Sequence, residues 1–485
     1  MKTVIAAIVA LAGATPALAG DAATTQSLDQ RLKVIERQLE IQQEDAQARA
    51  RETPGTTAGE KGFGFKSAKG DFEIRFKTLL QADGRFYTGD LSGQNFRDSF
   101  LLRRAETGFD GSLGKLVGFR LMAQLAPNSS GAAGPLDDWL ELRFHPAATI
   151  RVGRFKEPVG IETLQSSAAL VFIERGLPSE LTPSRDFGAQ LQGGVFDSAL
   201  IYAFGVFNGV ADGRDAASSD ADNRKELAGR IFSEPFRSSP GFLQGLGFGI
   251  GGSTGSRLPV AATNAFTSAN NSTDPPTFTF TATGDASNSQ LPTFRSPGQQ
   301  NFFAYRSTGT GATTAAAGAN VVQANGTFSR WSPQLYYYRY GFGLLGEYVE
   351  SEHTVQTSAV KPTRLRHKAY QGVASYVLGG DAAYTGVKPA HPYQPGADGW
   401  GALEIAARYA VLDVDDRAFP TFADPATQAT KATDWGAALN WHLTPNVRIG
   451  ANYDLTRFGG GAGVTAAPLD RRQERAIFLR TQISF

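Results

Sequence analysis

Most of the basic side chains that could do chemistry in this chain are arginines on the polar phase of alternating segments. In residues 72–85, for example, Phe72 and Ile74 alternate with Arg75 and Lys77. Over all such segments the polar phase carries ten bases and seven acids, and nine of the ten bases are arginine. The bases are Arg75, Lys77, Arg85, Arg120, Arg143, Arg224, Arg230, Arg408, Arg448 and Arg480, and the acids are Glu73, Asp83, Glu106, Glu141, Glu226, Glu404 and Asp454. A guanidinium donates two parallel hydrogen bonds to a carboxylate or phosphate, so this set predicts distributed attraction of small anions. The alternative is that the acidic and basic side chains together only keep the protein's interior hydrated and do not attract anions.

Two further groups of bases extend this set. Arg103 and Arg104 are adjacent, so both cannot face the same side of a regular strand. Arg104 shares its phase with Glu106 and is the expected inward residue, which leaves Arg103 for a rim, a bulge or a subunit contact. The second group lies in and beside an interruption between two alternating segments, at residues 158–187. The candidate anion-binding side chains are therefore Arg75, Lys77, Arg104, Arg120, Arg143, Arg154, Lys156, Arg175, Arg185, Arg230, Arg408, Arg448 and Arg480.

Catalytic and metal-binding patterns are weak by comparison. The chain has five histidines and no cysteine, and it has no H-E-x-x-H pattern. Asp413, Asp415 and Asp416 could contribute to a calcium site, but no twelve-residue binding loop follows, and a solvated loop is the simpler interpretation. We therefore expect no catalytic residue, no cofactor and no metal site. The formal charge of +1 gives no support to nucleic-acid binding.

The elements that must position these arginines are amphipathic strands. Alternating segments of about ten residues, separated by turns, are typical of a transmembrane β-barrel. Residues 1–19 have a basic start, an apolar run and Ala17-Leu18-Ala19, which predicts a signal peptide. No later segment has about 18 uninterrupted apolar residues, so a membrane location would require a closed barrel. We expect that barrel over residues 63–485, ending on an amphipathic strand with a terminal Phe485.

Other segments have their own signatures. Leu28, Leu32, Ile35 and Leu39 form a heptad seam that predicts a coiled coil within residues 20–51, with a lone amphipathic helix as the alternative. Residues 52–62 are expected to be a flexible linker. Residues 143–150 and 440–447 are expected to be periplasmic turns. The Ser-, Thr- and Asn-rich run 253–300 is expected to lie outside the cell without a core to order it.

Several short motifs of the chain also resemble those of a known family. Gly153-Arg154-Phe155-Lys156-Glu157-Pro158-Val159-Gly160, Phe172-Ile173-Glu174-Arg175, Arg185-Asp186-Phe187-Gly188 and the upstream Leu102-Arg103-Arg104-Ala105 resemble motifs of the phosphate-selective porins O and P of Gram-negative outer membranes. The resemblance implies an all-β, antiparallel barrel of 16 strands, trimeric in the outer membrane, with its N-terminal segment in the periplasm. It implies that the segment near 158–187 folds into the pore and narrows it.

The implied function is passive diffusion of small anions, phosphate among them. The interruption is poorer in lysine than phosphate-specific members would suggest, which keeps other solutes open. The alternatives are a general or non-phosphate porin, an envelope-anchoring protein and an outer-membrane hydrolase. The expected partners are two further copies of the chain, outer-membrane lipid and small anions.

Overall fold

The computed structural model describes residues 30–44, 54–59, 62–88, 97–126, 134–216, 220, 222–258, 265–268, 278–281, 290–306, 321–357, 360–460 and 473–485. The chain divides into two compact units. The smaller includes a helix at residues 30–44, within the expected coiled-coil segment. None of the helices described is both long and apolar enough to cross a membrane.

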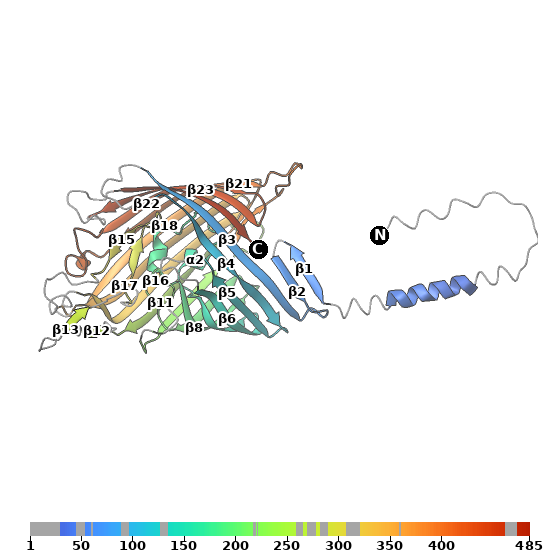
Figure 1. The fold of residues 1–485 in the computed structure, drawn as a ribbon, viewed down its shortest axis with the longest axis horizontal. Helices are drawn as coiled ribbons and strands as arrows, with labels where there is room; N and C mark the ends of the chain where they lie inside the picture. Colours follow the sequence, from blue (N-terminus) through green and yellow to red (C-terminus); the bar gives the residue numbers. More distant parts are fainter. Residues whose placement is uncertain are drawn as a thin grey trace, which may run out of the picture. The chain divides into compact units, whose positions relative to one another are not determined.

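The larger unit is a closed barrel of 16 antiparallel strands, which confirms the predicted fold class (Figure 1). The strands are β3 (Phe72–Tyr87), β4 (Ser99–Leu113), β5 (Val117–Gln124), β6 (Gly134–His145), β7 (Ala148–Lys156), β8 (Arg185–Val195), β9 (Leu200–Phe207), β10 (Glu226–Ser233), β11 (Leu246–Arg257), β16 (Gln323–Arg339), β17 (Phe342–Gln356), β18 (Thr363–Leu378), β21 (Ala402–Asp413), β22 (Lys431–His442), β23 (Val447–Gly459) and β24 (Gln473–Ser484). Each strand pairs with the next, and β24 pairs with β3 to close the ring. Closure leaves no open sheet edge within the ring, as a lipid environment demands.

The alternation of the sequence becomes the two faces of this wall. Leu80, Leu140 and Ile405 are exposed on the outside, whereas Gln81, Glu141 and Glu404, one residue away, are buried on the inside. Successive side chains of a strand point to opposite faces, so one apolar phase covers the exterior of the whole ring. The polar phase then faces the lumen.

Connections at one end of the barrel include short turns at residues 114–116, 146–147, 196–199 and 443–446. The two turns expected at 143–150 and 440–447 both belong to this end, where they join β6 to β7 and β22 to β23. A longer connection at the same end contains the hairpin of β19 (Gly380–Ala383) and β20 (Gly386–Pro389). At the opposite end, β11 ends at Arg257 and β16 begins at Gln323.

Two expectations for connecting segments were wrong where the structure describes them. Residues 55–59 of the expected linker form β1 (Gly55–Gly59), which pairs with β2 (Gly62–Lys66) beside β3. The run 253–300 was expected to lack a core, yet β11 extends to Arg257, and residues 290–306 contain a hairpin of β14 (Thr293–Arg295) and β15 (Asn301–Ala304). Phe294, Phe302 and Phe303 of this segment are fully buried in the largest hydrophobic cluster. Phe294 belongs to the run, and Phe302 and Phe303 directly follow it, so the apolar surface of three rings orders a segment that its average composition does not predict. Further along the same connection, β12 (Ala265–Ser268) pairs with β13 (Phe278–Thr281).

Residues 157–184, between β7 and β8, fold inside the ring of strands, and we call them the inward segment. They include the short helix α2 (Ile161–Leu164) and the 3-10 helix η2 (Leu177–Leu181). Another 3-10 helix, η3 (Asp416–Ala418), follows β21. Most of the inward segment is buried, and its partners come from strands as distant in sequence as β3 and β24. Figure 1 shows α2 among the strands of the ring.

Candidate functional site: the barrel lumen

Side chains of the wall hold the inward segment by its backbone carbonyl oxygens. Arg480 donates to Ile173 O (2.7 Å) and Arg408 donates to Glu174 O (2.9 Å). Arg448 donates to Leu170 O. Carbonyl oxygens of an irregular segment have no strand partner, so each must find a donor from the wall. Neutral donors complete the set: Gln81 to Ser167 O, Gln482 to Ala168 O, Asn440 to Val171 O, Gln334 to Val159 O and Tyr384 of the β19–β20 connection to Ile161 O.

Arg408 and Arg480 are also neutralised by carboxylates. Arg408 lies 3.1 Å from Asp434 and 2.8 Å from Asp454, and Arg480 lies 2.6 Å from Asp83. All three residues predicted from strands β21, β23 and β24 (Arg408, Arg448 and Arg480) are almost fully buried. These arginines anchor the inward segment against one side of the ring, and a passing solute has little access to them.

Glu174 of the inward segment is the acceptor for a second group of arginines. Arg103 donates to both of its oxygens (2.7 and 3.1 Å), Arg85 donates to Oε1 (2.8 Å), and Arg480 lies 3.6 Å away. Burial alone would raise the pKa of Glu174, but Arg103 and Arg85 hold that pKa well below its usual range. Glu174 is therefore an ionised carboxylate that ties the segment to β3 and β4.

Arg103 reaches Glu174 because β4 is bulged. Gln81 pairs with Arg104 and Ala82 pairs with Leu102, so Arg103 is the extra residue. The bulge lets both neighbouring arginines point inward. In the sequence, the adjacent Arg103 and Arg104 are the signal for this bulge. A rim position and a subunit contact were the other two expectations for Arg103.

The opposite side of the lumen stays open. A cavity of about 370 Å³ lies between Pro158 and Leu164 of the inward segment and the wall formed by β7, β8, β9 and β10. Its polar lining includes Arg151, Lys156 and Arg230, together with Gln190, Gln192 and Thr149. Arg151 was absent from the candidates, although it shares the phase of Glu141, with which it forms a 2.5 Å ion pair.

Lys156 and Arg175 converge on one oxygen at this open side. Lys156 Nζ donates to Gln165 O (2.8 Å), and Arg175 donates to the same oxygen (2.9 Å) and to Glu162 O (3.0 Å). Within the described residues, no carboxylate forms an ion pair with either cation. Burial lowers the pKa of Arg175, and the nearby Arg185 lowers it further. Both side chains therefore direct their donors at one neutral oxygen beside the open cavity.

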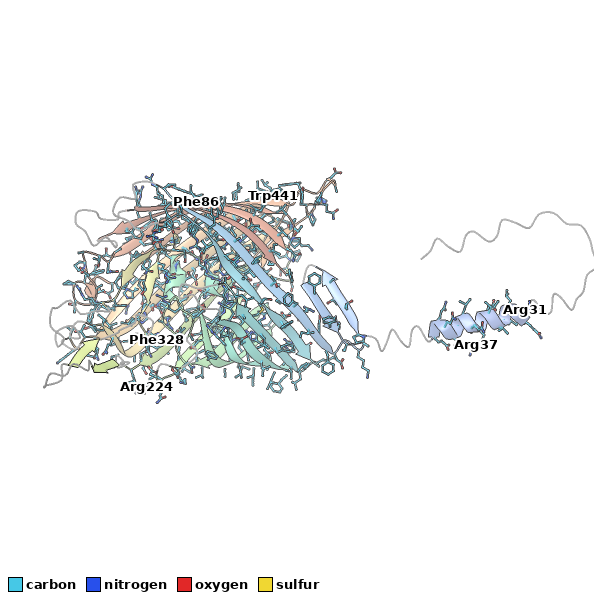
Figure 2. The ribbon with its side chains drawn as sticks, in the orientation of Figure 1. Arg31, Arg37, Phe86, Arg224, Phe328 and Trp441 are labelled. Atoms are coloured by element: carbon cyan, nitrogen blue, oxygen red, sulfur yellow. The ribbon has the colours of Figure 1, made fainter. Side chains whose placement is uncertain are left out.

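The other candidates are distributed around the lumen. Arg75, Arg120, Arg143 and Arg185 form ion pairs with Glu73, Asp110, Glu141 and Asp137 respectively. Arg104 donates to Gln81 (2.7 Å), Arg230 donates to Gln334 (2.8 Å), and Arg154 lies 5.7 Å from the Phe187 ring. Lys77 is half-buried on the inward phase of β3. Arg224, counted on the polar phase from the sequence, instead lies in the loop before β10 and is exposed, which corrects that assignment (Figure 2).

A serine, a histidine and an aspartate meet in the wall, which the sequence did not indicate. His353 Nε2 lies 2.7 Å from Asp212 and 3.0 Å from Ser351 Oγ, and Ser351 also donates to Asp212 (2.6 Å). A hydrolytic triad needs one imidazole nitrogen on the serine and the other on the acid. Here one nitrogen serves both, and Ser351 is fully buried. The cluster anchors the loop that carries Asp212, and it does not form a nucleophilic site.

Arg330 completes this anchor. It donates to Asp212 and Glu226, and it also donates to Val210 O. Burial would raise the pKa of Asp212, but His353 and Arg330 hold that pKa far below its ordinary value. A charged carboxylate with this many donors is a structural tie.

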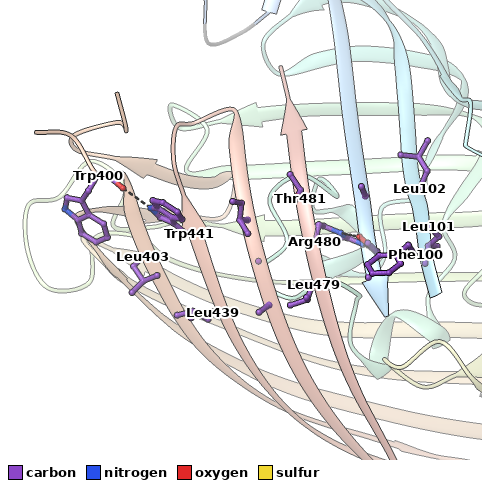
Figure 3. A pocket seen from close by; sticks show the side chains of 16 residues that line it. Phe100, Leu101, Leu102, Trp400, Leu403, Leu439, Trp441, Leu479, Arg480 and Thr481 are labelled. Carbon is purple, nitrogen blue, oxygen red and sulfur yellow. Dashed lines mark hydrogen bonds and ion pairs between the residues drawn. The ribbon is translucent and has the colours of Figure 1, made fainter. Parts of the chain in front are cut away.

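A larger cavity of about 910 Å³ lies on the outer wall (Figure 3). Its side chains are exposed apolar residues such as Phe100, Leu439 and Leu479, and Trp441 donates to Trp400 O at one edge. Arg480 and Asp83 border it while they pair with each other on the lumen side. This cavity belongs to the membrane-facing surface and not to the pore.

The comparison with known families decides the identity of this barrel. The sequence profile described as "Phosphate-selective porin O and P" matches residues 72–268 and 304–457, which include the barrel wall from β3 to most of β23 and the inward segment. The chain belongs to this family. The match confirms the resemblance seen in the motifs, and it identifies an outer-membrane porin. The porin family and the barrel fold indicate a channel in the outer membrane rather than an enzyme.

Solved structures resemble the porin in fold. The outer membrane channel DcaP of Acinetobacter baumannii matches with a TM-score of 0.50 at 10% identity, over 87% of this chain and 99% of that one. An anion-selective porin from Comamonas acidovorans has a TM-score of 0.49 at 11% identity, over 85% and 100% of the two chains. A loop-deletion mutant of OmpT, an outer membrane protein of Vibrio cholerae, has 0.48 at 11%, over 86% and 100%. No curated protein shows significant sequence similarity to the chain.

Proposed function

We propose that this porin passes small anions, phosphate among them, by diffusion along the open side of its lumen. The observation that carries the proposal is the convergence of Lys156 and Arg175 on Gln165 O beside the 370 Å³ cavity. An unneutralised cation pair lowers the energy of an anion most where the passage is narrow and partly dry. Lys156 and Arg175 both donate to the carbonyl oxygen of Gln165. This hydrogen bond limits their attraction for an anion, so an anion can bind and leave.

The remaining arginines divide into two roles in this proposal. Arg230 lines the same cavity and extends the attraction, whereas Arg151, which also lines it, is paired with Glu141. Arg408, Arg448 and Arg480 act indirectly, because they hold the inward segment that carries Arg175. The anion path therefore uses fewer arginines than the candidate set contained. Catalysis plays no part in this proposal, in which the N-terminal segment lies in the periplasm.

The test is the reversal potential of the purified porin in a planar bilayer under a KCl gradient. We expect anion preference in the native chain and a roughly fivefold lower anion-to-cation permeability ratio in Lys156→Gln/Arg175→Gln, equivalent to about 1 kcal/mol of lost attraction. Arg143→Gln is the matched control, because Arg143 is already paired with Glu141. A native potential near zero or of cation sign would leave a general porin and end the proposal.

Phosphate is tested on the same bilayers. If phosphate is among the solutes, adding it to the chloride solution should reduce the chloride current at lower concentration in the native chain than in the double variant. Equal reduction in both would show that the Lys156–Arg175 pair does not bind phosphate.

A further inference from the structure

The outer wall of the barrel carries exposed basic side chains at the end away from the short turns. On β22, β23 and β24 these are Lys431, Arg457 and Arg475, and each lies on the outward phase of its strand. On β10 and β11, the outward positions at the same end include Leu227 and Thr254, which pair with each other and carry no charge. The three bases are therefore a local feature of one part of the wall.

The register makes these three bases neighbours on the outer face. Thr433 pairs with Arg457, and Lys431 lies two residues before Thr433 on the same face. Arg457 in turn pairs with Gln473, two residues before Arg475. Each base is thus the diagonal neighbour of the next, about 7–8 Å away and within reach of a long side chain. We call Lys431, Arg457 and Arg475 the basic ladder.

Little negative charge compensates the basic ladder. Lys431 forms an ion pair with Asp413 (2.9 Å), and both side chains are nearly half exposed. In the part of the chain that the structure describes, Arg457 and Arg475 have no acidic partner. Two neighbouring guanidinium groups repel each other unless an anion lies between them. A phosphate group fits this position, because it accepts hydrogen bonds from two guanidinium groups at once.

The basic ladder lies close to exposed aromatic rings of the same wall. Trp435 of β22 and Tyr453 of β23 are exposed at 54% and 39%, and each lies four residues from the base of its own strand, on the side of the short turns. Trp and Tyr rings mark the membrane–water interface. Four residues of a tilted strand rise roughly 10 Å, which places the basic ladder at the depth of lipid head groups.

We propose that the basic ladder binds phosphate groups of lipopolysaccharide, the phosphorylated glycolipid of the outer leaflet. Basic side chains at a membrane surface attract anionic lipids. A lipid fits better than a soluble anion, because the same strands continue toward the short turns with exposed apolar residues such as Leu439 and Leu479. The proposal uses the expected orientation, in which the short turns face the periplasm, and it is independent of the ion that the pore passes.

The test is the affinity of the purified full chain in detergent for fluorescent lipid A, the bisphosphorylated anchor of lipopolysaccharide. We expect Arg457→Gln/Arg475→Gln to bind lipid A about tenfold more weakly than the native chain. Unchanged affinity would overturn the proposal, and so would equally tight binding of lipid A that lacks both phosphates. Inorganic phosphate should not displace lipid A at millimolar concentration, and displacement would assign the basic ladder to free phosphate instead.

Arg364→Gln/Arg366→Gln is the matched control. It removes two exposed guanidinium groups from the outward face of β18 at the same end, where Glu350 and Glu352 already pair with them. Exposed ion pairs of this kind contribute little, so the affinity for lipid A should stay within about twofold of the native value. An equal loss in both double variants would show that lipid A responds to total charge, which contradicts a site at the basic ladder.

A contact with a second copy in the proposed homo-oligomer is the competing role for the basic ladder. It predicts that Arg457→Gln/Arg475→Gln dissociates the oligomer in light scattering while the affinity for lipid A persists, and that result would refute the lipid site. Both substituted side chains point away from the lumen. The reversal potential of the variant should therefore be unchanged, which verifies that the variant still forms the native pore.

Discussion

At the scale of single residues, the carboxylate of Glu174 ties the inward segment to the wall. It accepts hydrogen bonds from Arg85 and Arg103 and lies 3.6 Å from Arg480. Glu174→Gln keeps the shape and removes the charge. Leaving buried guanidinium groups without their counter-ion costs roughly 3–5 kcal/mol. We expect the inward segment of the variant to fluctuate, with larger open-channel current noise and a higher mean conductance in single-channel recordings.

Glu141→Gln is the matched control for that change. Glu141 pairs with Arg143 and Arg151 and accepts from Gln192, all of which belong to the wall and not to the inward segment. The substitution removes the same charge from the same lumen. Equal noise in the two variants would show that Glu174 acts through the field of the pore and not as a tether.

For single residues, the sequence predicted which face of a strand each side chain occupies. It did not predict which groups that side chain contacts. Alternation alone placed Arg408 and Arg480 on the inner face, since strand periodicity fixes the side of each residue. It could not reveal that both meet carbonyl oxygens of residues more than 200 positions away. Arg103 was left undecided because a bulge inverts the phase and has no local signature beyond the paired arginines.

The hairpin of β14 and β15 shows how an element can narrow the lumen through packing. Phe303 stacks on Phe294 at 5.2 Å and meets Tyr305 edge-on, with His367 of β18 beside both rings. Phe303→Ala removes a fully buried ring, which costs about 3–5 kcal/mol. We expect the hairpin to lose its docked position, with faster tryptic cleavage after Arg295 and a higher conductance.

Phe100→Ala serves as the control, because Phe100 is exposed on the outer wall. It should change neither cleavage nor conductance. If Phe303→Ala behaves like Phe100→Ala, the hairpin is held by its hydrogen bonds alone.

The contact between this hairpin and the inward segment depends on pH. The backbone N–H of Arg295 donates to Glu180 Oε2 (2.9 Å), and burial raises the pKa of Glu180 from 4.5 to about 7. A raised carboxyl pKa contributes stability that is complete below pH 4.5 and disappears as the pH rises through about 7. We expect the Arg295 cleavage rate to increase between about pH 5 and 8.

Glu180→Gln should remove that increase, since an amide does not ionise. The cleavage rates need correction for the protease's own pH profile, measured on a denatured sample. A pH dependence that persists unchanged in Glu180→Gln assigns it to another group.

The sequence predicted the strands in which the alternation of apolar and polar residues is long and regular. The strands, the signal for two turns and the interruption between β7 and β8 all followed from the pattern of the chain. The β14–β15 hairpin and β1 did not, because short strands in Ser-, Thr- and Gly-rich runs have no amphipathic repeat to count. Their order comes from tertiary packing, such as the burial of Phe294 and Phe302.

At the scale of the whole molecule, an apolar cluster and a polar cavity occupy different parts of the lumen. The hydrophobic cluster joins Leu177 and Leu181 of the inward segment to the β14–β15 hairpin and to strands β17, β18 and β21. That side behaves as a protein core, and the side of β7 to β10 retains the polar cavity. A porin can thus combine a wide, stable ring with a passage small enough for its few unpaired charges to act on each ion.

The N-terminal helix offers the last prediction at this scale. Its apolar side chains are exposed in the single chain, among them Leu32, Ile35 and Leu39 of the heptad seam. A helix of about 15 residues is marginal in isolation, so a coiled coil would depend on the proposed homo-oligomer to bring the seams together. Leu32→Ala/Leu39→Ala should therefore lower the temperature at which the oligomer dissociates in detergent gels, without changing conductance.

Val34→Ala/Ile41→Ala is the control for that change. It removes similarly exposed apolar groups with the same spacing but off the seam, and it should leave the dissociation temperature unchanged. Equal effects from the two pairs would mean that the segment binds through general hydrophobicity and forms no coiled coil.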